Sequence, residues 1–175
     1  GAIECAGGAA GERVVGKTGP HSRASFERTV RINLVGTFNV IRLAAAKMSA
    51  QAPLASGERG VIVNTSSVAS FEGQIGQAAY AASKGGIAQL TKSLAIAWAA
   101  DGIRVNAIAP GWISTELTRG LTSDEARSAA ILARTPLKRW GEPADIGGSI
   151  VYLCSDAARF VTGIVLPIDG GYAAM

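Results

Sequence analysis

A tyrosine and a lysine four residues apart form the pattern with the clearest chemical meaning in this sequence. Tyr80 and Lys84 lie in Tyr-Ala-Ala-Ser-Lys, and on a helix this spacing places both side chains on the same face. A free phenol has a pKa of about 10, too high for acid–base work near neutral pH. A neighbouring ammonium favours the phenolate and is expected to lower that pKa. The pair could then move a proton to or from a carbonyl oxygen, although the spacing alone more often marks a packed tyrosine beside a solvated lysine.

Other polar and small residues stand where they could support the same chemistry. Ser67 precedes Tyr80 by thirteen residues and ends Asn64-Thr65-Ser66-Ser67, where its hydroxyl could hold a carbonyl oxygen. Near the start, the small residues of Cys5-Ala6-Gly7-Gly8 either let the backbone approach a ligand or form a simple tight turn, and both interpretations stay open. Asn33, taken alone, is more typical of a satisfied polar residue inside a helix.

Strands and helices must position these residues, and the apolar pattern predicts both. Strands are predicted at residues 61–63, 103–108 and 163–168, and the turn at Cys5 is a candidate end of a further strand. Helices are predicted through the apolar face of Phe26, Val30, Leu34, Phe38 and Ile41, from about 79 to 100, after the capping-box spacing of Thr122 and Glu125, and from about Pro143. Residues 51–60 indicate a surface loop. The alternation predicts one α/β domain over 1–175, a parallel sheet with helices on both faces.

Composition narrows the class of protein further. The 175 residues are 48% hydrophobic and 17% charged, which favours a folded chain. The net charge of +4 is scattered, so a nucleic-acid partner is not expected. Two distant cysteines and one histidine argue against a metal site and against a disulfide framework, which favours a reduced, cytoplasmic protein. Apolar runs stay below the ~20 residues of a membrane span.

Four motifs occur together in a characteristic order. They are Asn64-Thr65-Ser66-Ser67, Tyr80-x-x-x-Lys84-Gly85-Gly86, Ile103-Arg104-Val105-Asn106-Ala107-Ile108-Ala109-Pro110-Gly111 and Asp169-Gly170-Gly171. The set closely resembles the short-chain dehydrogenase/reductase family, from residue 3 to the C-terminus. The resemblance implies a Rossmann-like doubly wound parallel sheet and hydride transfer between a secondary alcohol or ketone and NAD or NADP, with NAD slightly favoured.

The same resemblance implies a role for each member of a catalytic tetrad. Tyr80 matches the general acid/base, and Lys84 matches the residue that lowers the tyrosine pKa and binds the nicotinamide ribose. Ser67 matches the group that orients the substrate oxygen. Asn33 matches the helix asparagine that holds a proton-relay water near the lysine.

Cofactor and substrate positions are implied in the same way. The implied cofactor contacts are Cys5, Ala6, Gly7, Thr65, Tyr80, Lys84, Pro110, Gly111, Ile113 and Thr115. The implied substrate contacts are Ser67, Gln74 and Trp112. Residues 115–135 match a mobile lid over the substrate pocket. Glu4 departs from the family, which has an asparagine there that braces the central strands; we expect this change to cost stability or to disturb the site.

Parts of the chain resemble particular members of the family. Residues 33–43 and 71–80 look like 3-hydroxyacyl-CoA dehydrogenase type 2, and residues 17–21 match its longer loop. After about Thr91 the chain looks more like bacterial 3-oxoacyl-reductases and sugar dehydrogenases. An acyl-CoA is therefore one candidate substrate beside a small alcohol or ketone.

The opening strand and Thr-Gly-x-x-x-Gly-x-Gly turn of the family do not occur in this sequence. The family pattern places roughly 70–80 further residues, with three strands, before Gly1. Three interpretations stay open: a partial sequence of a working dehydrogenase, a truncated and catalytically incompetent chain that acts as an oligomerising scaffold, and a non-catalytic binding or structural protein. A homo-oligomer, dimer or tetramer, is expected through the helices containing Phe38 and Lys84 and through the last strand.

Overall fold

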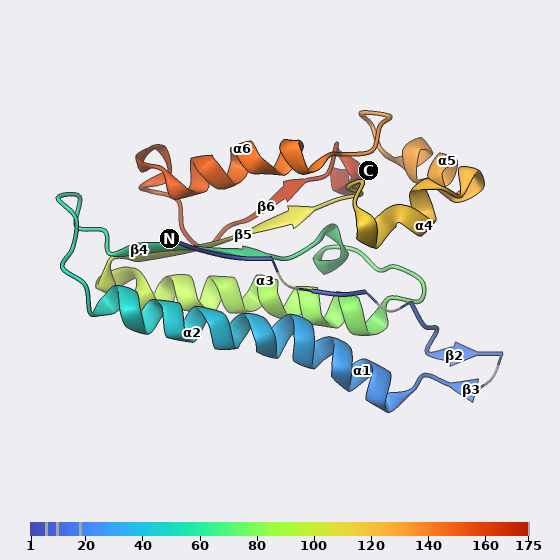
Figure 1. Cartoon of the computed structure of the whole chain (residues 1–175), viewed down its shortest axis with the longest axis horizontal. Helices are drawn as coiled ribbons and strands as arrows, with labels where there is room; N and C mark the ends of the chain where they lie inside the picture. The colour runs from blue at the N-terminus through green and yellow to red at the C-terminus, as the bar shows by residue number, and fades with distance from the viewer. Residues whose placement is uncertain (6, 10, 18, 175) are drawn as a thin grey trace.

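The computed structural model describes residues 1–5, 7–9, 11–17 and 19–174. Its centre is a parallel four-stranded sheet in the order β1-β4-β5-β6, and a short antiparallel hairpin lies outside it (Figure 1). The strands are β1 (Ala2–Glu4), β4 (Gly60–Thr65), β5 (Ile103–Pro110) and β6 (Val165–Ile168), and the hairpin pairs β2 (Val15–Gly16) with β3 (Gly19–Pro20). The predicted strands are thus confirmed, including the one that ends before the turn at Cys5, whereas the hairpin was not predicted.

Helices cover both faces of the sheet, as the alternating pattern predicts. The helical elements are α1 (Arg23–Val30), η1 (Arg31–Val35), α2 (Gly36–Ser49), η2 (Val68–Ser70), α3 (Ala78–Trp98), η3 (Ala99–Asp101), η4 (Glu116–Thr118), α4 (Arg119–Thr122), α5 (Glu125–Arg134), α6 (Pro143–Cys154), η5 (Asp156–Ala158) and η6 (Tyr172–Ala174). Helices α2 and α3 lie under one face and α6 lies over the other (Figure 1). Segments α4 and α5 gather beyond the carboxyl ends of the strands.

The core consists of two layers, one on each side of the sheet. Because side chains alternate along a strand, Ile62 of β4 faces α2 and α3, whereas Val61 and Val63 face α6. In the α6 layer these two valines pack with Ile108 and Leu153. Both central strands are buried on both faces, which explains their nearly continuous apolar runs.

The helical stretch from α1 to α2 differs from its predicted apolar face. Phe26 and Phe38 are 39% and 43% exposed, because the π-helical turn η1 interrupts the α-helical spacing between them. The buried face is instead polar in its first half and apolar in its second half. Its members are Thr29, Asn33, Thr37, Ile41, Ala45 and Met48.

The helix starts are largely as expected, with one different cap. Helix α6 begins at Pro143, as predicted. Helix α5 follows the predicted Thr122–Glu125 signal, but its cap is Asp124, whose Oδ1 accepts a hydrogen bond from the Arg127 N–H at 3.0 Å. The carboxylate is the better acceptor for an N-terminal amide, because it also complements the helix dipole.

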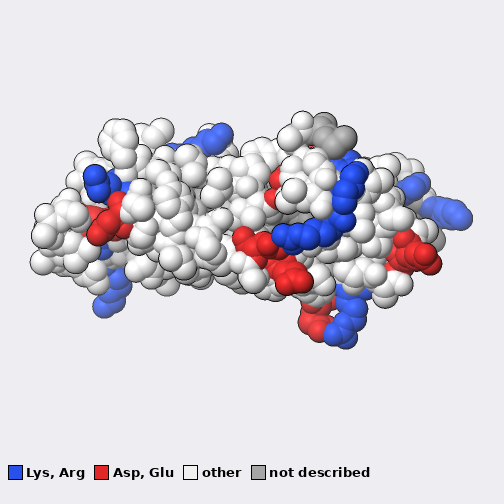
Figure 2. Space-filling view, turned by 90° about the horizontal axis from the view of Figure 1, so that it is seen from above, with Lys and Arg blue, Asp and Glu red and all other residues white. Residues whose placement is uncertain are grey.

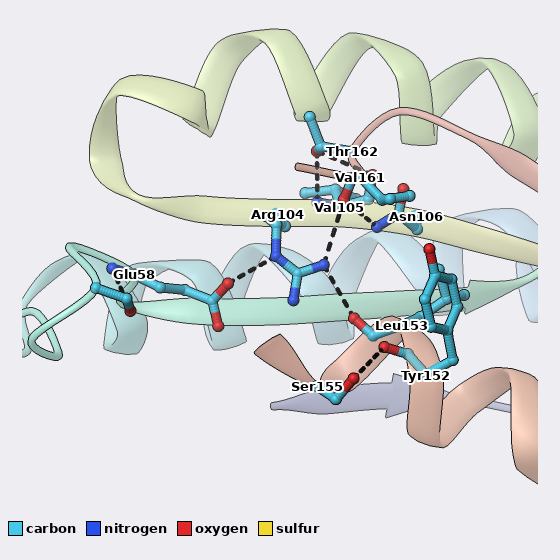
Figure 3. Close-up of polar contacts among 10 residues, drawn as sticks. Glu58, Arg104, Val105, Asn106, Tyr152, Leu153, Ser155, Val161 and Thr162 are labelled. Atoms are coloured by element: carbon cyan, nitrogen blue, oxygen red, sulfur yellow. Dashed lines mark hydrogen bonds and ion pairs between the residues drawn. The ribbon is translucent and has the colours of Figure 1, made fainter. Parts of the chain in front are cut away.

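Arg104 ties together the end of the molecule that lies opposite the carboxyl ends of the strands. Its side chain is buried, and its Nε donates to Glu58 Oε2 at 2.6 Å (Figure 3). Its Nη1 donates to the carbonyl oxygens of Leu153 and Val161 at 2.9 and 3.2 Å. One guanidinium thereby joins β5 to the loop before β4, to α6 and to the segment before β6.

Charge is mixed over the face that carries α6. Figure 2 shows basic and acidic side chains side by side toward the α4–α5 end, and a broad uncharged area beside them. No helix in the described part of the chain is long and apolar enough to cross a membrane. Over the same residues, no group of three or more His, Cys, Asp or Glu side chains could hold a metal ion.

Candidate active site

The fold brings the four tetrad residues to the carboxyl ends of β1 and β4. Ser67 follows β4 and caps η2, while Tyr80 and Lys84 lie in the first turns of α3. Asn33 lies in η1, which packs against α3. In open parallel sheets this edge is where ligands bind, because the loops after the strands open a crevice there.

Lys84 is buried deeply for a lysine, at 4% exposed. Its Nζ donates a hydrogen bond to the carbonyl oxygen of Thr65 at 2.8 Å and lies 5.7 Å from the ring centroid of Tyr80. Burial lowers the pKa of this ammonium, while the negative charge of Glu4 and the sulfur of Cys5 oppose that effect. The ammonium is thus fixed beside the tyrosine ring by the backbone of β4.

Tyr80 differs from the expectation drawn from the sequence. Burial raises the pKa of its phenol, and a hydrogen bond with the Ser67 side chain opposes the rise. The expected lowering by Lys84 is not seen, since the ammonium sits over the ring and is bonded to Thr65. Serine and tyrosine do meet, so their two hydroxyls can hold one substrate oxygen between them.

Asn33 is fully buried and is satisfied by the turn after β1. Its Nδ2 donates to the Gly8 carbonyl at 2.9 Å and to Ser83 Oγ at 3.1 Å, and its Oδ1 accepts from the Gly8 N–H at 2.9 Å. A Cβ added to Gly7 would lie 3.4 Å from Asn33 Oδ1 and 3.5 Å from Lys84 Nζ, so Gly7 passes between the two side chains. The side chain therefore holds the turn in place beside the lysine.

The expected cofactor positions lie along the same edge. Cys5 and Gly7 are exposed after β1, while Ala6 lies outside the described residues. Thr65 Oγ1 donates to the Glu4 carbonyl at 2.6 Å and lies 3.8 Å from Cys5 Sγ. These small exposed residues would let a polar ligand approach the backbone closely, and the buried ammonium beside them is a cationic hydrogen-bond donor.

The Pro110–Thr115 segment leaves the end of β5 beside them. Gly111 touches Asp169 so closely that an added Cβ would lie 2.6 Å from the Asp169 Cβ, and only glycine fits. Ile113 forms a bridge with Gly141, and Thr115 caps η4 from an exposed position. The segment is thereby fixed at the carboxyl-end edge of the sheet.

The expected substrate positions are surrounded by aromatic and charged groups. Trp112 packs edge-to-face against Trp140 and Tyr172, with ring centroids 6.2 and 6.1 Å apart. Its indole Nε1 is buried and has no partner within the described residues. Gln74 Nε2 donates to Glu72 Oε1 at 3.0 Å. Gln74 and Trp112 thus each belong to a cluster that reaches toward α5.

One ion pair in this region was not predicted. Arg134, at the end of α5, binds the Glu72 carboxylate, donates from Nη1 to the Tyr172 hydroxyl at 3.1 Å and stacks 4.2 Å over that ring. It joins the loop before α3 to the expected lid and to the C-terminal turn. Glu72 and Arg134 are 62 residues apart, so spacing within one element could not predict their contact.

Known proteins are similar to this chain over most of its length. Residues 1–173 match a family model described as Enoyl-(Acyl carrier protein) reductase. The chain is 45% identical over 148 residues to the 2-dehydro-3-deoxy-D-gluconate 5-dehydrogenase of Bacillus subtilis, covering 85% of this chain and 56% of that protein. It is 42% identical over 171 residues to the 3-hydroxyacyl-CoA dehydrogenase type-2 of Homo sapiens, covering 97% and 64%.

A solved structure has the same fold. The gluconate 5-dehydrogenase of Burkholderia cenocepacia J2315, in complex with NADP and tartrate, superposes with a TM-score of 0.91 at 35% identity. That match covers 99% of this chain and 64% of the other. The chain therefore spans only part of the length of the proteins it matches.

Proposed function

Because the chain belongs to the short-chain dehydrogenase/reductase family, we propose that it carries the catalytic residues of an oxidoreductase that uses NAD or NADP and acts on a secondary alcohol or its ketone. The meeting of Ser67 and Tyr80 beside the buried Lys84 carries this proposal. Solved relatives described in complex with NADP or with NADH support either cofactor. Cys5, Gly7, Thr65, Lys84 and the Pro110–Thr115 segment would hold it.

Each tetrad residue has a defined task in this reaction. The chemistry that a nicotinamide would supply, when bound, is transfer of a hydride to the carbonyl carbon or, in the reverse direction, its acceptance from the alcohol carbon. Tyr80 donates its phenolic proton to the carbonyl oxygen, while the Ser67 hydroxyl holds that oxygen in place. The Lys84 ammonium stabilises the phenolate that remains. Asn33 keeps the turn after β1 in position beside the lysine.

We propose a 3-hydroxyacyl-CoA as the first substrate to test. Residues 33–43 and 71–80, which include Asn33, Gln74 and Tyr80, carry the resemblance to 3-hydroxyacyl-CoA dehydrogenase type 2. A sugar acid is the second candidate, because the chain is 45% identical to a 2-dehydro-3-deoxy-D-gluconate 5-dehydrogenase. Initial rates with 3-hydroxybutyryl-CoA and with 2-dehydro-3-deoxy-gluconate distinguish the two candidates.

We also propose a cytoplasmic homo-oligomer, a dimer or a tetramer. Exposed apolar side chains on α2 and α6 support it, among them Leu43 and Val151 at 58% and 70% exposed. Phe160, beyond the end of α6, is fully exposed. Light scattering tests this proposal, and a clean monomer would contradict it.

The alternative is a chain that has the tetrad but lacks a complete cofactor site and acts as an oligomerising scaffold. The chain spans 56–64% of the length of these curated relatives. Binding of NAD or NADP by the 175-residue chain, measured by calorimetry, tests the two functions against each other. Saturable binding supports the oxidoreductase, and its absence supports the scaffold.

A further inference from the structure

A buried carboxylate occupies the position where the family resemblance implies an asparagine. Glu4 ends β1 and is only 5% exposed. A carboxylate in such a place is costly unless charges and hydrogen bonds compensate it. The Thr37 hydroxyl donates to Glu4 Oε2 at 2.9 Å, and the Thr65 hydroxyl donates to the Glu4 backbone carbonyl at 2.6 Å. The surrounding elements thus hold both the side chain and the backbone of Glu4.

Lys84 is an equally buried cation, and the charge of Glu4 favours its protonated form. Both residues contact Thr65, whose hydroxyl donates to the Glu4 backbone carbonyl and whose own carbonyl accepts from Lys84 Nζ at 2.8 Å. The groups around the ammonium come from four elements: Glu4 and Cys5 at the end of β1, Thr65 of β4, Asn33 of η1, and Tyr80 of its own helix. Of the described titratable groups around the ammonium, Glu4 alone is a carboxylate, while Cys5 is a thiol and Tyr80 is a phenol.

We infer that Glu4 is the counter-ion of Lys84, a positioning residue that keeps the buried lysine charged so that it can support the Tyr80 phenolate. Only the kinetic consequence of this inference rests on the proposed function. The interaction between the Glu4 and Lys84 charges does not require catalysis. An asparagine at the same place could brace the strands, but it would carry no charge to offset the desolvation of the ammonium.

The hydroxyl of Thr37 links this pair to Asn33. It lies 2.9 Å from Glu4 Oε2 and 2.6 Å from the backbone carbonyl of Asn33, and a single hydroxyl proton serves one of them at a time. An ionised Glu4 is the stronger acceptor and draws this proton.

The direct test is the titration of Lys84 in the Glu4→Gln variant, which keeps the size and the acceptor oxygen but removes the charge. Lysine labelled with carbon-13 at Cε reports each titration by NMR, and a Lys84→Arg variant assigns the signal. The pKa of Lys84 should be lower in Glu4→Gln than in the parent protein, because Cys5 alone then opposes the effect of burial. In the control Glu27→Gln, which removes an exposed ion pair with Arg23, the signal should not move.

Folding of each variant is checked by circular dichroism. If Glu4→Gln does not fold, Glu4→Asn restores the residue of the family pattern and should lower the Lys84 titration in the same way. An unchanged Lys84 titration in a folded variant of either kind would overturn the inference.

A second readout is the pH dependence of turnover in the parent protein and in Glu4→Gln. Lys84 must be charged to stabilise the phenolate, so activity falls as pH rises through the lysine pKa. The alkaline limb of the kcat profile should move to lower pH in Glu4→Gln, whereas a purely structural role would lower kcat equally at every pH and would overturn the inference. A parent protein without dehydrogenase activity contradicts the proposed function, while the NMR titration still decides the pairing.

Discussion

Replacing Asn33 by alanine tests whether the turn after β1 is held from η1. The change removes three hydrogen bonds, two with the Gly8 backbone and one with Ser83, from a fully buried position. Each such bond contributes about 1 kcal/mol, but Gly8 is only half-buried, so its freed groups can reach water. We therefore expect the free energy of unfolding to fall by about 2–3 kcal/mol.

The matched control lies six residues further along the same helical stretch. Asn39 is exposed and its Oδ1 accepts one bond from Arg42 Nε at 3.1 Å, so Asn39→Ala should change the free energy of unfolding by less than about 0.5 kcal/mol. Urea unfolding followed by circular dichroism measures both variants. A loss in Asn33→Ala no larger than that of the control would refute the conclusion that Asn33 anchors the turn.

Three further perturbations probe other parts of the molecule. Gly111→Ala places a Cβ 2.7 Å from the Asp169 Cα and should destabilise by roughly 1–3 kcal/mol in urea unfolding, whereas Gly148→Ala, in open space on α6, should stabilise by up to about 1 kcal/mol. A hydrogen bond from Arg139 holds the pKa of Asp145 well below its usual value, so the stability from this pair is full at neutral pH and lost in acid. The gap in stability between the parent and Asp145→Asn should stay constant near neutral pH and close as pH falls below about 4; a gap that stays constant in acid would contradict this. Glu72→Gln weakens the ion pair with Arg134 of α5. In initial-rate assays KM should rise by a larger factor than kcat falls, and equal factors would argue against residues 115–135 acting as a lid.

The fold could be predicted from the sequence because its signals are local and periodic. The runs at 61–63 and 103–108 became the central strands, and Pro143 marked the start of α6. The ordered motifs also placed Ser67 and Tyr80 at one edge of the sheet. These features depend on residue type and spacing within one element, which a single sequence contains.

Other features depend on contacts between distant segments and left no such signal. The π-helical turn at Asn33 rotates Phe26 and Phe38 outward and turns polar groups toward the sheet, which apolar spacing alone does not predict. The raised pKa of Tyr80 results from tertiary burial. The burial of Glu4 likewise required the positions of three other elements.

The most direct measurement of the central claim compares the parent protein with its Tyr80→Phe variant. The variant keeps the ring and removes only the hydroxyl that meets Ser67. Reduction of NAD and of NADP is followed by nicotinamide absorbance with 3-hydroxybutyryl-CoA and with other secondary alcohols. The account predicts turnover in the parent and a loss of at least ~100-fold in kcat in the variant, the lower range for a general acid/base, with unchanged stability. Turnover in Tyr80→Phe equal to that of the parent would contradict it.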